Sequence, residues 1–231
     1  MILGSTIADN LARVREAIEA AIARRGAGPT VTLIGVSKRQ PIAAIEAARA
    51  AGLADFGENY AQELRDKVTA IGRAPPTWHF IGGLQSNKVK LVCGQAMIHT
   101  VDRPSLVDAL EARAARDGVI QELLLEVNLA GEAQKAGAAP EALPALLDRI
   151  AAASALRCRG LMIIPPVDEP EESRRWFVRL RELRDRLAGD ARPNVELHHL
   201  SMGMSADFAV AIEEGATLVR VGTAIFGPRP G

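Results

Sequence analysis

Hydrophobic residues recur along the chain in short runs, and segments with helical periodicity separate these runs. The short runs, which are typical of buried strands, occupy residues 32–37, 53–56, 78–82, 97–101, 122–127, 158–164, 195–200 and 217–221. Helical patterns between them include "PIAAIEAARAAG", "ENYAQELRDKVTAIG", "RPSLVDALEARAARDG" and "PEALPALLDRIAAASA". Several runs, such as "LLLEV" and "GLMII", are apolar at consecutive positions. Parallel strands that are covered on both faces show this pattern.

The alternation of apolar runs with helical segments predicts a (β/α)8 barrel of the TIM type. The alternative is an open, doubly wound α/β sheet. That fold usually carries a Gly-x-Gly-x-x-Gly turn after a strand, and no apolar run here is followed by one. A chain of 231 residues has about the size of one such barrel. We therefore expect a single domain over residues 1–231, with the barrel at residues 31–227.

The segment before the barrel carries the pattern of an amphipathic helix. Its apolar residues recur every three or four positions and form one stripe: Ile7, Leu11, Val14, Ile18 and Ile22. Ser5 or Thr6 can cap the start of this helix, and Gly26 can end it. The sequence thus predicts an additional N-terminal helix within residues 1–26.

The charge balance argues against a nucleic-acid or anionic-membrane partner. Lys and Arg number 28, Asp and Glu also number 28, and the formal net charge is zero. A chain without a global basic field has little long-range attraction for polyanions. We interpret the arginine-rich segment 170–189 as the solvated face of a helix for the same reason.

The cysteines, the histidines and the N-terminus set further expectations. Cys93 and Cys158 are far apart and lack metal-ligand spacing, which indicates a reduced, cytoplasmic protein. We expect both to be buried, although either remains a candidate redox-sensitive thiol. The N-terminus resembles neither a secretory signal nor a transit peptide, and no apolar run reaches transmembrane length. His79 and His99 are isolated in strand-like runs and are predicted to be core residues. No metal site is expected, because the adjacent His198 and His199 would face opposite sides of a strand.

The residues at the ends of the predicted strands are mostly polar or glycine, although the strands themselves are apolar. Chemistry in a TIM barrel is located at the C-terminal ends of its strands. The last two strands end in "LSMGMSAD" and "LVRVGTAIFG", which combine glycines with hydroxyl side chains. Glycine allows backbone N–H groups to approach an anion, and the loops after strands seven and eight often bind phosphate in such barrels. The two segments therefore favour a phosphate site over a pair of ordinary turns.

Arg220 and Lys38 add candidate chemistry to this end of the barrel. Arg220 lies between Val219 and Val221 and should point opposite to them, into the top of the barrel. A buried arginine needs an acceptor, either a carboxylate such as Glu126 or Asp102, or the ring nitrogen of a ligand. Lys38 ends the first apolar run. Alone it would be interpreted as a surface charge, but beside a phosphate site and an inward arginine it matches the amine that forms an imine with a phosphorylated aldehyde.

Eight blocks, in order over almost the whole chain, resemble the pyridoxal phosphate homeostasis protein family. They are "GVSKRQP", "DFGENYAQE", "WHFIGGLQSNK", "HTVDR", "EVNLAGEAQKAG", "RGLMIIPP", "LSMGMSAD" and "VRVGTAIFG". The resemblance implies a fold type III barrel, similar to the N-terminal domain of alanine racemase, that holds pyridoxal 5′-phosphate (PLP). It also implies the roles of the candidate site residues: Lys38 as the Schiff-base lysine, Ser201, Gly222 and Thr223 as phosphate-binding residues, Met202 and Gly203 in the same loop, Arg220 facing the pyridine nitrogen, and Asn59 lining the ring.

The expected function is therefore intracellular PLP homeostasis or carriage without efficient turnover, by a monomer or weak dimer whose candidate recipients are PLP-dependent apo-enzymes. Two alternatives stay open: an amino-acid racemase of the same fold, and a barrel enzyme that uses Lys38 on a phosphorylated sugar. Racemisation needs acid–base groups on both faces of the substrate carbon. Tyr60, the only tyrosine, follows the second strand, which is the wrong element for the second group.

Overall fold

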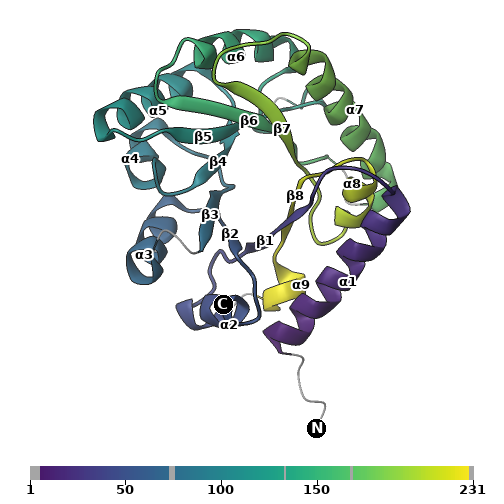
Figure 1. Ribbon diagram of the computed structural model, residues 1–231. Coiled ribbons are helices and arrows are strands. Elements are labelled where there is room, and N and C mark those ends of the chain that lie inside the picture. The colour runs from purple at the N-terminus through teal and green to yellow at the C-terminus, as the bar shows by residue number, and fades with distance from the viewer. Residues whose placement is uncertain (1–5, 73–75, 133, 167–168, 229–231) are drawn as a thin grey trace.

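The computed structural model describes residues 6–72, 76–132, 134–166 and 169–228. Eight parallel strands close into a barrel in chain order, and β8 pairs with β1 (Figure 1). The strands are β1 (Thr32–Val36), β2 (Asp55–Glu58), β3 (Thr77–Phe80), β4 (Met97–Val101), β5 (Gln121–Glu126), β6 (Leu156–Met162), β7 (Val195–Ser201) and β8 (Leu218–Val221). This closure confirms the predicted (β/α)8 barrel and rules out an open sheet.

Helices surround the barrel (Figure 1). The α-helices are α1 (Ile7–Arg25), α2 (Ile42–Ala50), α3 (Ala61–Ile71), α4 (Val89–Val92), α5 (Pro104–Asp117), α6 (Leu143–Ala151), α7 (Pro170–Ala188), α8 (Phe208–Glu213) and α9 (Thr223–Phe226). Two 3₁₀ turns, η1 (Ser86–Lys88) and η2 (Pro140–Ala142), precede α4 and α6. Among these described segments, none has the length and apolar composition that a membrane-spanning helix requires.

The N-terminal helix α1 forms as predicted and completes the outer layer. Thr6 caps it through a capping box with Asp9, while Ser5 lies outside the described residues. Its apolar stripe is buried at Leu11, Val14 and Ile18. Only the four-residue α9 follows β8, so β8 lacks a long helix of its own to cover its outer side. α1 contacts α2, α8 and α9 and so fills this side of the ring (Figure 1).

Two apolar clusters stabilise the barrel. The larger one lies between the strands and the surrounding helices and includes Val219 and Val221. A small separate cluster consists of Ile34, Leu124, Met162 and Leu218. Since neighbouring residues of β8 face opposite sides, Leu218 and the small cluster fill the barrel interior. Arg220 shares the interior face with Leu218, as the sequence predicts, and is 4% exposed.

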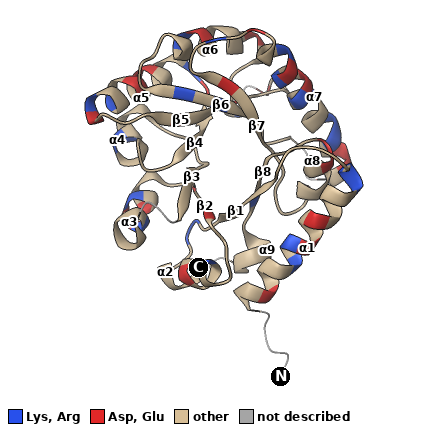
Figure 2. Ribbon diagram, viewed as in Figure 1, with Lys and Arg blue, Asp and Glu red and all other residues tan. Residues whose placement is uncertain are grey.

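The charged residues belong mainly to the outer helices, where both signs are interspersed (Figure 2). In α7, Arg174 pairs with Glu171 at 2.8 Å and also reaches Glu213, the last residue of α8, and the following Glu214, each at 2.8 Å. The arginines of α7 therefore include residues that bind α8, and not only a solvated face.

Both cysteines are free and buried. Burial raises the pKa of the Cys93 thiol to about 11 and that of Cys158 to about 12. Thiols with such pKa values carry almost no thiolate near neutral pH, which makes them poor redox sensors. In the part of the chain that the structure describes, no group of three or more His, Cys, Asp or Glu side chains could hold a metal ion.

Candidate functional site

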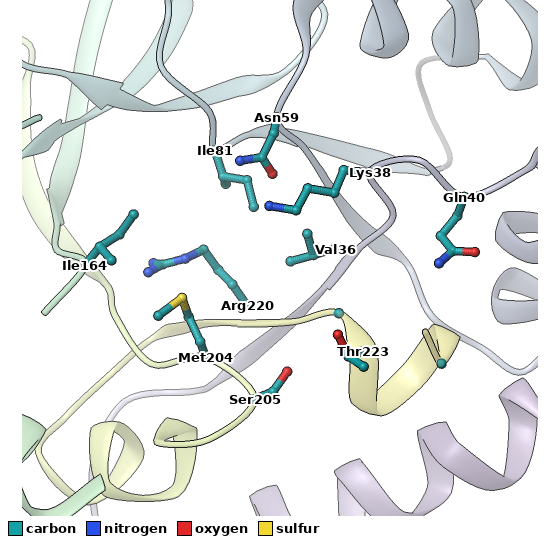
Figure 3. A pocket seen from close by; sticks show the side chains of 12 residues that line it. Val36, Lys38, Gln40, Asn59, Ile81, Ile164, Met204, Ser205, Arg220 and Thr223 are labelled. Atoms are coloured by element: carbon teal, nitrogen blue, oxygen red, sulfur yellow. The ribbon is translucent and has the colours of Figure 1, made fainter. Parts of the chain in front are cut away.

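A cavity opens at the C-terminal ends of the barrel strands, where the sequence places the candidate chemistry (Figure 3). It is lined by Val36, Lys38, Gln40, Asn59, Ile81, Ile164, Met204, Ser205, Arg220, Gly222, Thr223 and Gly227. Five of the eight predicted site residues are therefore on its wall: Lys38, Asn59, Arg220, Gly222 and Thr223. Segments from opposite ends of the sequence meet here because β8 pairs with β1.

Lys38 is the second residue after the end of β1 and is half-buried. Figure 3 shows its amine end and the guanidinium of Arg220 pointing into the same space. Asn59 and Ile81 border this space on one side and Met204 on the other. The lysine is thus a cavity group and not a surface charge.

A buried ion cluster holds the backbone on the N-terminal side of Lys38. The Lys67 amine, carried by α3, donates to the Ser37 carbonyl, to Glu58 and to Glu63, each at 2.7 Å. Ser37 donates through its hydroxyl to the same Glu58 oxygen at 2.6 Å. Burial raises the pKa of Glu58, whereas the nearby Lys67 charge opposes that rise.

The same cluster also binds the backbone after Lys38. Arg39 donates its backbone N–H to Glu63 at 2.6 Å. It adopts a left-handed conformation with φ of +60°, which is uncommon for a residue other than glycine. Hydrogen bonds on both sides of Lys38 therefore fix the point from which its side chain enters the cavity. Sequence reasoning did not identify Glu58, Glu63 or Lys67 as part of the site.

Arg220 crosses the interior and reaches the cavity wall from β8. It donates to the Ser201 hydroxyl at 2.5 Å and to the Ile163 carbonyl at 3.0 Å. Burial lowers the pKa of Arg220 to about 10, against the attraction of the Asp207 and Glu126 charges, so the guanidinium is cationic at neutral pH. Among the described residues, no ion pair includes Arg220. A direct salt bridge between Arg220 and Glu126 or Asp102, which was one of the two alternatives from the sequence, is therefore not formed.

Three predicted site residues lie behind the cavity wall. Ser201 and Met202 are fully buried. Ser201 directs its hydroxyl toward Arg220 and His99. Gly203 has a φ of +91°, and its carbonyl accepts the Arg220 backbone N–H at 3.0 Å. A Cβ on Gly203 would approach the Phe208 backbone at 2.9 Å, so glycine is needed for this close packing. Phosphate contacts by these residues stay a prediction.

The loop after β7 instead presents the next two residues to the cavity. Met204 is half-buried and Ser205 is exposed, and both line the wall. Figure 3 shows the Ser205 hydroxyl on the same side of the cavity as that of Thr223. The second serine of "LSMGMSAD" was the available signal for this position. The two strand-end loops thus bring two hydroxyls and Gly222 to one edge of the cavity.

Asn59 supplies an acceptor that the protein does not use. Its Oδ1 is buried and has no hydrogen-bond partner among the described residues. Leaving a buried polar atom unpaired costs about 1–3 kcal/mol, so such an atom on a cavity wall indicates a ligand donor. The cavity therefore offers an amine, a cationic donor, a vacant acceptor and a hydroxyl-lined edge.

The closed barrel with its additional N-terminal helix has the fold of the alanine racemase N-terminal domain. The family model for this domain covers residues 6–230. Alanine racemase from Corynebacterium glutamicum has the same fold at 17% identity, with a TM-score of 0.63 over 94% of this chain and 60% of that one. This distant likeness shows the fold alone.

The chain belongs to the pyridoxal phosphate homeostasis protein family. It is 45% identical to the pyridoxal phosphate homeostasis protein of Aquifex aeolicus over 96% of this chain and 97% of that one. It is 46% identical to the Pseudomonas aeruginosa protein of the same name, over 97% and 96% of the two chains. The structure of PipY from Synechococcus elongatus with PLP bound matches at 38% identity with a TM-score of 0.83, over 96% of this chain and all of that one.

Proposed function

We propose that this protein binds PLP as an imine on Lys38 and carries the cofactor in the cytoplasm without efficiently turning over a substrate. The observation that supports this most directly is the shared cavity of Lys38 and Arg220 with the vacant acceptor of Asn59. The solved PipY structure with PLP bound belongs to a relative of similar length. Two free, buried cysteines agree with a reducing compartment.

Each functional group of PLP has a chemical counterpart on the cavity wall. The Lys38 amine can condense with the aldehyde, releasing one water, and the reverse reaction with water frees the cofactor. Arg220 can donate to the ring nitrogen, and Asn59 Oδ1 can accept from the ring hydroxyl. The phosphate would lie at the edge formed by Gly222, Thr223 and Ser205. The donor set therefore fits the cofactor.

Borohydride reduction of the loaded protein tests the assignment of Lys38. Reduction converts the imine into a stable secondary amine, and peptide mass mapping should locate the pyridoxyl group on Lys38. The matched control is Lys38→Arg, which keeps the positive charge and cannot form the imine. Label found only on Lys67, Lys88, Lys90 or Lys135 would overturn the assignment, and absence of any visible absorbance would favour the sugar-phosphate alternative.

The carrier function predicts that the protein is not an efficient racemase. Among the described residues that line the cavity, Lys38 and Arg220 are the titratable ones, and racemisation needs a second proton-transfer group on the opposite face. Tyr60 is 48% exposed, lies in a separate groove and contacts Arg39.

Incubation of the PLP-loaded protein with L-alanine in deuterated water tests this. We expect retention of both chirality and the Cα proton. Fast deuterium exchange together with accumulation of D-alanine would show a racemase. Transfer to a PLP-dependent apo-enzyme and sedimentation of the loaded protein test the carriage and the expected monomer or weak dimer.

A further inference from the structure

A row of hydrogen-bonded side chains crosses the barrel interior and ends at Arg220. It begins at Asp55, the first residue of β2, and continues through His79, His99 and Ser201 on β3, β4 and β7. The successive distances are 3.0 Å from Asp55 Oδ1 to His79 Nε2, 3.0 Å from His79 Nδ1 to His99 Nε2, 2.9 Å from His99 Nδ1 to Ser201 Oγ, and 2.5 Å from Ser201 Oγ to Arg220 Nη1. The two histidines, predicted to be isolated core residues, are buried but bonded to each other.

The chemistry of the two end residues determines in which direction hydrogen bonds are donated along this row. A guanidinium can only donate hydrogen bonds and a carboxylate can only accept them. Arg220 therefore donates to Ser201 at one end, and His79 donates its Nε2–H to Asp55 at the other. When His79 carries one ring hydrogen and gives it to Asp55, its Nδ1 must accept, so His99 donates from Nε2.

The intermediate residues agree with the same direction. His99 is fully buried, and burial together with the neighbouring His79 and Arg220 holds the pKa of its imidazole well below the usual range. It is therefore neutral and has one donor and one acceptor. With its hydrogen on Nε2, its Nδ1 accepts from the Ser201 hydroxyl, which leaves the Ser201 lone pairs for Arg220. Each group in the row is satisfied in one arrangement.

We propose that Asp55, His79, His99 and Ser201 are positioning residues that fix the tautomers of both histidines and hold Arg220 in one orientation at the cavity wall. Arg220 is then anchored by three contacts behind the wall, with Ser201, with the Ile163 carbonyl and through its backbone with Gly203. Hydrogen bonds aligned in one direction polarise one another. The Asp55 charge thereby influences the guanidinium from the far end of the row. The ligand readouts below rest on the proposed PLP function, whereas the tautomers do not.

Asp55 offers the sharpest perturbation because its side chain is partly exposed, at 23%, and a substitution there leaves the core intact. Asp55→Asn keeps the shape, but its amide can accept or donate and no longer enforces the direction. Asp55→Leu removes the acceptor. His198→Asn is the matched control, since His198 lies on β7 with a side chain that is 73% exposed and outside the row.

The first experiment measures the imidazole ¹⁵N shifts of the ligand-free protein near neutral pH. In the wild type and in His198→Asn, we expect both His79 and His99 to carry their hydrogen on Nε2. In Asp55→Leu, a second tautomer should appear at His79 and His99 together, because the row has lost the group that sets its direction. A wild-type His99 with its hydrogen on Nδ1, or a change confined to His79 in Asp55→Leu, would overturn the proposal.

The second experiment uses PLP labelled with ¹⁵N in its ring. Asp55→Leu should move the ring ¹⁵N shift toward that of a nitrogen without a donor and should weaken PLP binding by roughly threefold to tenfold, the range for one hydrogen bond. Pyridoxal binding should weaken by the same factor, since phosphate is not involved. A purely structural role predicts lost stability with unchanged tautomers and an unchanged ring shift, which would refute the positioning role. If reduction labels no Lys38, the proposed function fails, yet the tautomers still decide whether the row is directed.

Discussion

Replacing Lys67 with methionine tests the buried ion cluster that holds the backbone around Lys38. Methionine keeps an unbranched chain of similar length and removes the charge. The Lys67 side chain is 7% exposed and that of Glu58 is fully buried. Without Lys67, the buried Glu58 carboxylate keeps only the Ser37 hydroxyl as a donor among the contacts described above. Removing one partner of a buried ion pair costs about 3–5 kcal/mol, so the free energy of unfolding should fall by about that amount at pH 8.

The pH dependence of this loss identifies Glu58 as its cause. Burial already raises the pKa of Glu58 above the ordinary value of 4.5, and Lys67 opposes that rise. Removal of Lys67 should raise the pKa further. An ionised carboxyl whose folded pKa exceeds its unfolded pKa destabilises the fold, and protonation removes that penalty. The loss should therefore be largest at pH 8 and should shrink as the pH falls toward 4.5.

Urea denaturation at pH 8 and pH 5 measures these differences for the wild type, Lys67→Met, Glu58→Gln and the double variant. We expect the double variant to recover most of the stability lost in Lys67→Met, because no buried charge remains. Lys90→Met is the control, since Lys90 is an exposed lysine on α4. A loss that is equal at both pH values and persists in the double variant would refute the reasoning.

Two further substitutions probe the cavity and its surroundings. Thr223→Ala should weaken PLP binding by roughly tenfold and leave pyridoxal binding nearly unchanged, because a charge-assisted hydrogen bond contributes about 1.5–3 kcal/mol; equal effects in equilibrium titrations of the two ligands would place the phosphate elsewhere. Burial and the nearby Asp102 raise the pKa of Glu126 from 4.5 to about 7. The wild type should therefore lose up to about 3 kcal/mol of stability as the pH rises from 5 to 8, and Glu126→Gln should remove this loss in urea denaturation; identical pH profiles would contradict it.

The barrel itself was predictable because it follows from periodicity, whereas some element limits were not. The apolar pattern predicts the second strand at residues 53–56, but β2 spans Asp55–Glu58. Leu53 is buried between the turn that follows α2 and the start of β2, so its apolar side chain resembles that of a strand residue in the sequence. Glu58 is buried within β2 because Lys67 compensates its charge. A run of apolar residues in the sequence does not distinguish a buried residue outside a strand, such as Leu53, from a strand that ends in a buried charged residue, such as Glu58.

The sequence predicted a cavity residue correctly where its position at the end of a strand was enough to place it at the cavity. Lys38, Asn59, Gly222 and Thr223 follow strands, and the ends of parallel barrel strands necessarily meet. Ser201 is also at a strand end, yet its side chain turns inward to Arg220, while Ser205 reaches the cavity. The choice between two serines in one loop depends on loop conformation, which the φ of +91° at Gly203 controls.

The row from Asp55 to Arg220 and the ion cluster around Lys67 show why the sequence alone does not identify the partners of buried polar groups. His79 and Ser201 are separated by 122 positions, and each looks unremarkable within an apolar strand. Only closure of the barrel brings β3, β4, β7 and β8 into one interior, where a histidine without a partner would be costly. The requirement that buried polar groups be paired therefore applies to the row as a whole. Arg220 points into the barrel, so its guanidinium needs hydrogen-bond acceptors on the interior side as well as a ligand in the cavity. The row supplies the acceptor on the interior side through Ser201.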